Sequence, residues 1–228
     1  MSLLKIAKKY STIKNNLDYM IIYENYFKSI RNQKLNILEI GVDKGESLKL
    51  WREYFPLANI CAIDLVDRNI SINNTKIFIG DQSDHNFLQS ITDEYKFFDI
   101  IIDDGSHKSK HIISSFNFLF SYLNNNGFYV VEDLQTSYQP RYGGSRFNLN
   151  KSNTSMNFLK RLADSINFEH HDRPFYSKSQ FDGLIKSVFF HQNIVFVKKG
   201  DSTKFFFNEI KKINLNDKLK KIISFFYS

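Results

Sequence analysis

The feature that most constrains the fold is an alternation of short apolar runs with amphipathic segments between residues 35 and 134. Apolar runs such as "NILEI", "NICAID" and "FDIII" are separated by stretches whose apolar residues have helical spacing. Strands that alternate with helices join through right-handed crossovers into a parallel sheet, and continuous apolar strands suit a sheet covered on both faces. The stretch "NNNG" is expected to end a helix before the fifth strand. We therefore predict an α/β protein with a doubly wound, Rossmann-like, mostly parallel sheet.

The segments outside this alternation complete the expected organisation. Residues 1–34 are predicted to form an N-terminal helical segment that acts as a lid or cap, and residues 35–200 a cofactor-binding domain. Within that domain the polar residues 135–180 are expected to form a substrate loop with one helix at 154–166. The stretch "LIKSVFFHQNIVFVKKG" alternates around a turn and predicts an antiparallel hairpin that closes the sheet. Residues 201–228 predict a basic amphipathic helix.

Charge and cysteine content narrow the classes of partner. The chain carries 31 Lys and Arg against 24 Asp and Glu, a net charge of +7, which favours anionic partners. Arginines interleaved with aromatic residues are not evident, so we expect no nucleic-acid partner. A peripheral membrane contact through the C-terminal helix and a homodimer both stay open. The single cysteine, Cys61, is expected to be buried, and the lack of a signal-peptide pattern or of an apolar run of ~20 residues predicts a cytoplasmic protein without a transmembrane segment.

Carboxylates stand where each predicted strand ends. In a doubly wound sheet these ends form one rim, and ligands bind in the crevice beside it. Clustered carboxylates repel one another unless a cation or hydrogen-bond donors compensate them. The rim therefore predicts a binding site, built from Glu39, Asp64, Asp81, Asp103, Asp104, Glu132 and Asp133.

The first strand end, "EIGVDKGES", has the properties of a cofactor loop. Gly41 and Gly45 allow a sharp turn and a close approach of a ligand to the backbone. Asp64 follows Gly41 at the distance at which an acid accepts hydrogen bonds from ribose hydroxyls, which serves any adenosine-containing cofactor. The spacing E-x-G-x-x-x-G lacks a glycine that a dinucleotide's pyrophosphate requires. A tight strand–helix turn without a ligand is the alternative.

The fourth and fifth strand ends, "DDGSH" and "ED", suggest a metal site. Asp104, Glu132 and Asp133 offer three carboxylates, which are the hard oxygen ligands that Mg²⁺ or a similar divalent cation prefers. His107 lies three residues beyond Asp104 and is placed to accept a proton from a hydroxyl polarised by the metal. In the alternative reading the acids cap loops and helix N-termini, and His107 is a solvated turn residue.

Together these stretches resemble a known family. The stretches "LEIGVDKGESLKLWREYFPLANICAIDL", "GDQSD", "FDIIIDDGSH" and "NGFYVVEDLQTSY" look like class I S-adenosylmethionine-dependent methyltransferases, and within them the macrocin-type, metal-dependent sugar O-methyltransferases. Members of that family modify deoxysugars on macrolides and sugars in surface polysaccharides. The resemblance covers about residues 7–200. It implies the class I methyltransferase fold, with residues 35–200 as the S-adenosylmethionine-binding domain.

The resemblance also implies roles for individual residues. Asp104, Glu132 and Asp133 would bind magnesium, and His107, with Asp104 beside it, would be the catalytic base. Glu39, Gly41 and Asp64 would hold the methionine and ribose parts of the cofactor, Asp81 and Gln82 would lie near the adenine, and Asp103 would touch the amino group. The methionine pocket departs from the family at Gly45-Glu46-Ser47, where the family often has "GGS" and where Gly45 and Ser47 would contact the cofactor. A further departure, Thr12-Ile13-Lys14 in place of "TDK", affects the expected lid.

The function so implied is metal-assisted transfer of a methyl group to a sugar hydroxyl, on a small-molecule or nucleotide-linked sugar or on a sugar of a surface polysaccharide or natural product. Two alternatives stay open at this stage. One is an NAD-dependent oxidoreductase on a related sheet. The other is a non-catalytic scaffold that docks on a membrane or an enzyme complex.

Overall fold

The computed structural model describes residues 2–10, 18–171 and 177–202. Nearly all of the predicted C-terminal helix lies outside these residues, as does the segment Thr12-Ile13-Lys14. None of the helices in the described parts of the chain has the length and apolar character that a membrane crossing requires.

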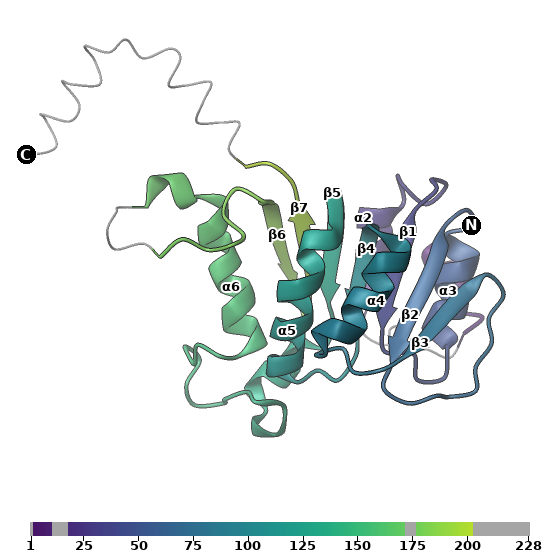
Figure 1. The fold of residues 1–228 in the computed structure, drawn as a ribbon, viewed down its shortest axis with the longest axis horizontal. Helices are drawn as coiled ribbons and strands as arrows, with labels where there is room; N and C mark the ends of the chain where they lie inside the picture. The colour runs from purple at the N-terminus through teal and green to yellow at the C-terminus, as the bar shows by residue number, and fades with distance from the viewer. Residues whose placement is uncertain (1, 11–17, 172–176, 203–228) are drawn as a thin grey trace, which may run out of the picture.

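A single seven-stranded sheet forms the centre of the molecule, with strand order β3-β2-β1-β4-β5-β7-β6 (Figure 1). Strands β1 to β5 run parallel, and β7 and β6 are antiparallel to their neighbours. The prediction of a doubly wound sheet with a C-terminal hairpin is confirmed. The strands are β1 Asn36–Ile40, β2 Asn59–Asp64, β3 Thr75–Ile79, β4 Phe98–Asp103, β5 Leu123–Val131, β6 Ile185–His191 and β7 Ile194–Lys199.

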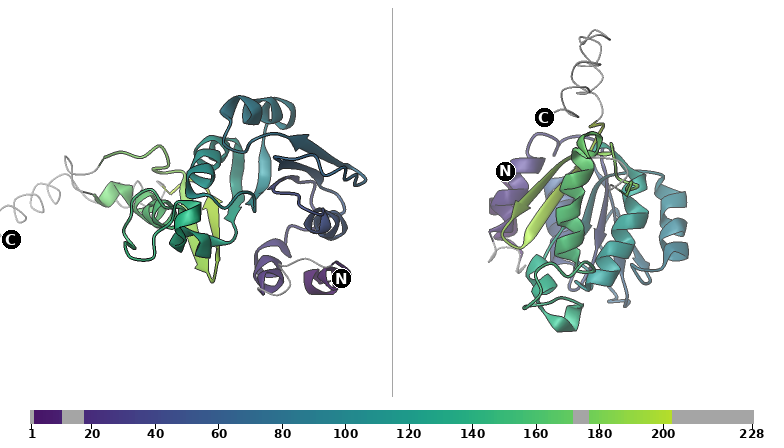
Figure 2. Two further views of the ribbon diagram at one scale, coloured as in Figure 1. Left: turned by 90° about the horizontal axis from the view of Figure 1, so that it is seen from below. Right: turned by 90° about the vertical axis from the view of Figure 1, so that its left-hand side faces the viewer.

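Helices cover both faces of the sheet, and each face has its own apolar core (Figures 1 and 2). Helices α1, α2 and α3 pack on one face, and α4, α5 and α6 pack on the other. The helices are α1 Leu3–Ala7, α2 Tyr19–Phe27, α3 Glu46–Tyr54, α4 His85–Tyr95, α5 Ser109–Leu119 and α6 Ser155–Ile166, with short 3₁₀ turns η2 Phe120–Tyr122, η3 Leu134–Tyr138, η4 Pro140–Tyr142 and η5 Phe168–His170.

Helix α2 is held on its face of the sheet by aromatic packing. The ring of Tyr23 lies 4.9 Å from that of Trp51 in α3 and 5.3 Å from that of Phe196 in β7, both edge-on. All three side chains are fully buried, and burial of one such side chain stabilises a fold by roughly 1.5–3 kcal/mol. The N-terminal segment is therefore part of the core over α2.

The expectation that "NNNG" ends a helix is wrong. Helix α5 ends earlier, at Leu119, and β5 already begins at Leu123, so the asparagines belong to the strand. The pairing of β4 with β5 shifts register between Phe98 and Ile100, which accommodates the extra residues. Asn124 also donates a 2.8 Å hydrogen bond from Nδ2 to Asp99 Oδ1. Both contacts are made with the neighbouring strand β4. They therefore cannot be predicted from the local sequence around the asparagines.

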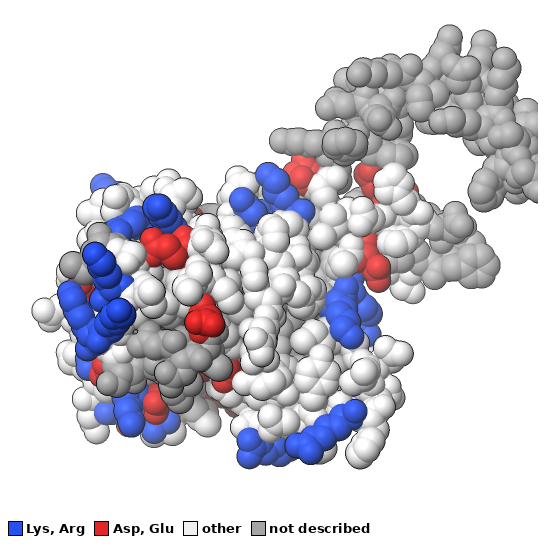
Figure 3. Space-filling model, turned by 180° about the vertical axis from the view of Figure 1, so that it is seen from behind, with Lys and Arg blue, Asp and Glu red and all other residues white. Residues whose placement is uncertain are grey.

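The surface charge of the α1–α3 face is mixed. On its visible described part, Lys and Arg side chains lie in separate groups with Asp and Glu among them and apolar or neutral surface between them (Figure 3). The net charge of +7 is not gathered into one continuous stripe on this face.

Candidate active site

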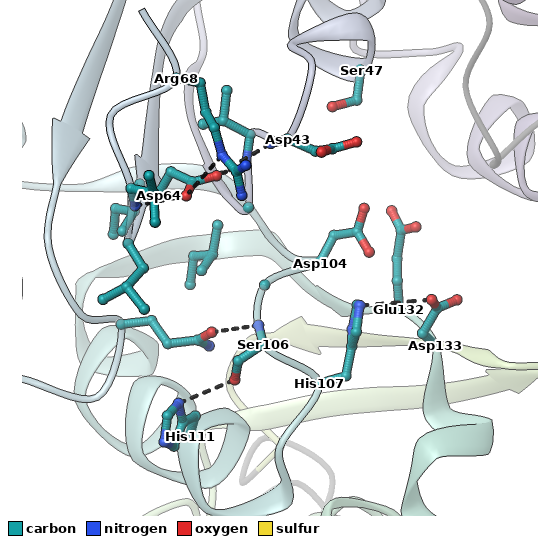
Figure 4. Close-up of a pocket in the computed structure, with 18 of the residues that line it drawn as sticks. Asp43, Ser47, Asp64, Arg68, Asp104, Ser106, His107, His111, Glu132 and Asp133 are labelled. Carbon is teal, nitrogen blue, oxygen red and sulfur yellow. Dashed lines mark hydrogen bonds and ion pairs between the residues drawn. The ribbon is translucent and has the colours of Figure 1, made fainter. Parts of the chain in front are cut away.

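The rim predicted from the sequence encloses a cavity of about 550 Å³. Loops after β1, β2, β3, β4 and β5 line it, together with Tyr19 from α2. Figure 4 shows Asp104, Glu132, Asp133 and His107 on one side of the cavity and Asp64 with Arg68 on the other. The predicted site residues among its lining are Gly41, Ser47, Asp64, Asp81, Gln82, Asp104, His107, Glu132 and Asp133. Of the other predicted residues, Glu39, Gly45 and Asp103 do not belong to this lining, which is drawn from the described part of the chain.

Gly41 brings the first and fourth strand ends into contact. Its φ is +96°, and a Cβ built there would lie 2.3 Å from the carbonyl oxygen of Asp104. The backbone amide of Asp104 also donates a 2.9 Å hydrogen bond to the carbonyl of Ile40. No other residue type can adopt this conformation and fit this space without a shift of the backbone. The glycine therefore fixes how close the cofactor loop lies to the acidic loop.

Asp64 shapes the cofactor loop through backbone hydrogen bonds. Its Oδ2 accepts from the amides of Val42 at 3.0 Å and Asp43 at 3.2 Å, and its Oδ1 accepts from the amide of Val66 at 2.9 Å. Partial burial acts to raise the pKa of Asp64, but these three amides and the nearby Arg68 guanidinium hold it below the usual value. Asp64 thus stays ionised at the edge of the cavity, and the contact with ribose stays a prediction.

Glu39 lies behind the wall of the cavity. Its Oε1 accepts a 3.1 Å hydrogen bond from the indole Nε1 of Trp51, and both side chains are fully buried. Helix α3 thereby connects to the end of β1. The contact of Glu39 with the methionine part of the cofactor stays a prediction.

Asp103 turns to the α5 face of the sheet, away from Asp104. Its carboxylate accepts hydrogen bonds from Ser115 Oγ at 2.8 Å and from Gln82 Nε2 at 3.1 Å. Burial raises the pKa of Asp103, and the hydrogen bonds from Ser115 and Gln82 oppose the rise. Gln82 also accepts from the amide of Ser106 at 2.9 Å. The pair Gln82–Asp103 therefore connects the loop after β3 with the end of β4, and of the two residues Gln82 lines the cavity.

Asp81, which is expected near the adenine, and His111 both line the cavity. Asp81 Oδ1 accepts from both the amide and the hydroxyl of Ser83 at 2.8 Å, and these bonds lower its pKa. His111 Nδ1 lies 3.1 Å from Ser106 Oγ. The sequence reasoning missed His111, although it belongs to the same stretch as His107.

The acidic side of the cavity gathers Asp104, His107 and Asp133. One potential ligand atom from each lies within 4.8 Å of the other two, and His107 Nε2 lies 3.8 Å from Asp133 Oδ2. His107 and Asp133 both have left-handed backbones, with φ of 55° and 54°. Such conformations cost free energy and are concentrated at functional sites. Local backbone conformation thus contributes to bringing this histidine and this carboxylate together.

Two tyrosines that the sequence reasoning did not assign to the site contact its acids from α2. Tyr23 donates a 2.6 Å hydrogen bond to Glu132 Oε1, and Tyr19 donates one of 3.1 Å to Asp133 Oδ1. Both belong to the buried face of α2. Helical spacing predicts which face of the helix a residue lies on, but it does not predict which group its hydroxyl contacts.

The donor set fits a divalent cation. Asp104, Asp133 and Glu132 supply carboxylate oxygens at one end of the cavity, and such oxygens suit Mg²⁺ or Mn²⁺. The compact trio in the structure contains His107 where the prediction had Glu132, and the buried Glu132 lines the same cavity. The assignment of individual ligands stays a prediction.

Comparison with known proteins identifies relatives of this chain. No protein-family model matches the chain. Mycinamicin VI 2''-O-methyltransferase of Micromonospora griseorubida is 36% identical over 189 residues, which are 78% of this chain and 47% of that protein. 8-Demethyl-8-(2-methoxy-alpha-L-rhamnosyl)-tetracenomycin-C 3'-O-methyltransferase of Streptomyces olivaceus is 35% identical over 188 residues, or 78% of this chain and 48% of that protein. The chain thus spans about half the length of the curated relatives that it matches.

A solved structure agrees with these relatives. MycE methyltransferase from the mycinamycin biosynthetic pathway, in complex with Mg and SAH, superposes with a TM-score of 0.83 at 34% identity, over 89% of this chain and 55% of that one. The seven-stranded sheet of the present chain matches the class I methyltransferase fold of that protein. Over the part it spans, this chain is therefore a homologue of the macrocin-type sugar O-methyltransferases and has their class I methyltransferase fold.

Proposed function

We propose that the protein is an S-adenosylmethionine-dependent O-methyltransferase that methylates a sugar hydroxyl with the help of a divalent cation. The observation that carries this proposal is a single cavity with a glycine-turned cofactor loop on one side and the group Asp104, His107 and Asp133 on the other. The relatives are named as sugar O-methyltransferases, and one MycE structure is a complex with Mg, SAH and mycinamycin VI. These names favour methyl transfer over the NAD-dependent alternative.

The β1–β2 side of the cavity would hold the methyl donor. Gly41 leaves room for close approach to the backbone, and Ser47 and Asp64 present polar side chains to the cavity. Asp64 is already ionised and fixed by three amides, so it can accept hydroxyl hydrogen bonds without rearrangement of the loop. Asp81 and Gln82 lie beyond it, where the adenine is expected.

The β4–β5 side would hold the cation and the acceptor. Asp104, Glu132 and Asp133 would hold the ion, which when bound would supply Lewis acidity that lowers the pKa of an acceptor hydroxyl. His107 would accept the hydroxyl proton at Nε2, where Asp133 Oδ2, 3.8 Å away, stabilises the imidazolium. The transfer forms an oxygen–carbon bond and breaks the sulfur–methyl bond of the sulfonium, and the proton ends on His107.

The acceptor would be a small-molecule or nucleotide-linked sugar, or a sugar of a surface polysaccharide or natural product. Arg141 and Arg146 in the predicted substrate loop are exposed and suit a diphosphate or a sugar. We place the reaction in the cytoplasm and the protein in polysaccharide or natural-product biosynthesis.

A transfer assay with labelled donor tests the proposal. The full chain is incubated with methyl-labelled S-adenosylmethionine and a panel of nucleotide-linked sugars and glycosides, with and without EDTA. We expect label in at least one sugar, loss of transfer with EDTA and recovery with Mg²⁺. Calorimetry that detects binding of NAD but not of S-adenosylmethionine would overturn the methyltransferase proposal, and transfer that ignores EDTA would remove only the cation from it.

A further inference from the structure

Helix α2 presents two tyrosine hydroxyls, four residues apart, to the two acids that directly follow β5. Tyr23 reaches Glu132 and Tyr19 reaches Asp133. Neighbouring acids of the chain thus receive donors from neighbouring turns of one helix. Helix α2 precedes the sheet in the sequence and packs on the sheet face that bears α1 and α3.

The surroundings of Tyr23 and Glu132 fix the positions of both partners in their hydrogen bond. Both side chains are buried, and the hydroxyl of Tyr23 lies 2.6 Å from Glu132 Oε1, to which it donates. Its ring is held by the rings of Trp51, Phe196 and Phe27, with centroids 4.9, 5.3 and 5.4 Å away. The hydroxyl consequently holds one oxygen of Glu132 in a single position.

Tyr19 joins Asp133 to the C-terminal hairpin. Its hydroxyl lies 3.1 Å from Asp133 Oδ1 and also 3.1 Å from the carbonyl oxygen of Asn193, in the turn between β6 and β7. The amide of Leu134 donates to that same carbonyl at 2.9 Å. The left-handed backbone of Asp133 is therefore held from two directions, by the N-terminal helix and by the hairpin.

We propose, on the basis of the function proposed above, that Tyr23 and Tyr19 are positioning residues that orient the carboxylates of Glu132 and Asp133 for the divalent cation. A carboxylate that is already hydrogen-bonded on its outer side loses less freedom when it binds an ion. Removal of such a partner typically weakens metal affinity by about 10–100-fold. The N-terminal segment thereby gains a role in metal binding in addition to the predicted lid.

The matched variants are Tyr23→Phe and Tyr19→Phe, with Tyr26→Phe as the control. Tyr26 lies on the same helix, its hydroxyl contacts His191 Nε2 at 2.8 Å, and its ring stacks on Phe196 at 4.2 Å. The control therefore loses a hydroxyl near the same aromatic cluster without losing a bond to a carboxylate of the cavity.

The test measures Mn²⁺ binding to the wild type and the three variants by electron paramagnetic resonance, and SAH binding by calorimetry. We expect the Mn²⁺ Kd to rise about 10–100-fold in Tyr23→Phe. A smaller rise, below about tenfold, is expected in Tyr19→Phe because its hydroxyl is shared with Asn193. Tyr26→Phe should leave the Mn²⁺ Kd unchanged, and all three variants should keep the SAH Kd of the wild type.

Melting curves separate positioning from a structural role. If Tyr23 only supports the fold, Tyr23→Phe lowers Tm equally with EDTA and with Mn²⁺, and the Mn²⁺ Kd stays within twofold of the wild type; that result overturns the inference. If the inference is right, Mn²⁺ raises the Tm of Tyr23→Phe by less than it raises the Tm of the wild type. The rise in Tyr26→Phe should equal that of the wild type.

Wild-type behaviour distinguishes this inference from the proposed function. A wild type that transfers methyl groups but binds no Mn²⁺ overturns the inference and leaves the methyltransferase standing. A wild type that binds Mn²⁺ and loses affinity in Tyr23→Phe, yet methylates no sugar in the panel, supports the inference while the proposed function fails.

Discussion

The carboxylates on the two sides of the cavity differ in their hydrogen-bond partners and in their distance from one another. On the β1–β2 side, Asp64 receives three backbone amides and Glu39 receives the indole of Trp51. On the β4–β5 side, Asp104, His107 and Asp133 bring ligand atoms within 4.8 Å of one another, and tyrosine hydroxyls contact Glu132 and Asp133. Like charges so close repel unless a cation joins them. The first side is thus built to keep a loop in shape, and the second is suited to an ion.

The adjacent residues Asp103 and Asp104 make the same contrast within one strand end. Successive side chains of a strand point to opposite faces. Asp103 is buried against Ser115 and Gln82, whereas Asp104 lines the cavity. The two adjacent aspartates therefore have different environments, and single substitutions can test the role of each one.

The largest expected effect comes from Asp104→Asn. This substitution removes a carboxylate from the β4–β5 side of the cavity and leaves the β1–β2 side unchanged. Loss of one carboxylate that is proposed to hold the cation should lower methyl transfer by about 10³-fold or more and weaken Mn²⁺ binding. SAH affinity should stay near that of the wild type, because the β1–β2 side is untouched. Rates and calorimetry on the same preparation measure both, and a parallel loss of SAH binding in folded protein would show that the two sides are not independent.

His107→Gln sharpens the assignment on that side. If His107 is the base, as proposed, its loss should lower the rate by roughly 10²–10⁴-fold while the Mn²⁺ Kd changes little. Rate and Mn²⁺ affinity are measured together. If Mn²⁺ affinity falls as far as in Asp104→Asn, His107 is a metal ligand and the base must be sought elsewhere.

Asp64→Asn breaks the β1–β2 side. Hydrogen bonds to a charged group are worth about 1.5–3 kcal/mol, so SAH affinity and unfolding free energy at pH 7 should both fall, with Mn²⁺ affinity kept. The folded-state pKa of Asp64 lies below its unfolded value. Its stabilisation is therefore complete above the unfolded pKa, about 3.9, and is lost as pH falls through the lowered folded pKa. Urea denaturation between pH 7 and pH 3 should show this loss in the wild type and less of it in the variant.

Asp103→Asn has the smallest expected effect and the opposite pH dependence. Burial raises the folded-state pKa of Asp103, so its contribution is most favourable below the unfolded pKa and declines as pH rises through the folded one. The amide keeps an acceptor for Ser115 and carries no charge. We expect a change within about 1 kcal/mol at pH 7 by urea denaturation, and a flatter pH profile. A loss as large as that of Asp64→Asn would contradict the contrast between the two acids.

The sequence predicted the fold and the rim for physical reasons that are local. Apolar runs such as "NICAID" and "FDIIID" define strands without knowledge of their neighbours, and parallel strands necessarily gather their ends. The homologous fold of MycE agrees with that prediction.

Other features depend on contacts that the sequence does not list. The start of β5 depends on its pairing with β4. The direction of Asp103 depends on strand alternation combined with the place of Ser115, and the hydroxyls of Tyr19 and Tyr23 matter because α2 packs beside the ends of β5 and β7. These are tertiary relations between segments far apart in the chain.

Anomalous diffraction from crystals grown with Mn²⁺ and SAH tests the division of the cavity most directly. The account predicts one manganese peak bound by oxygens of Asp104, Glu132 and Asp133, with the ribose of SAH against Asp64 and no manganese on that side. A manganese ion beside Asp64, or SAH with its ribose against Asp104 and Asp133, would contradict it.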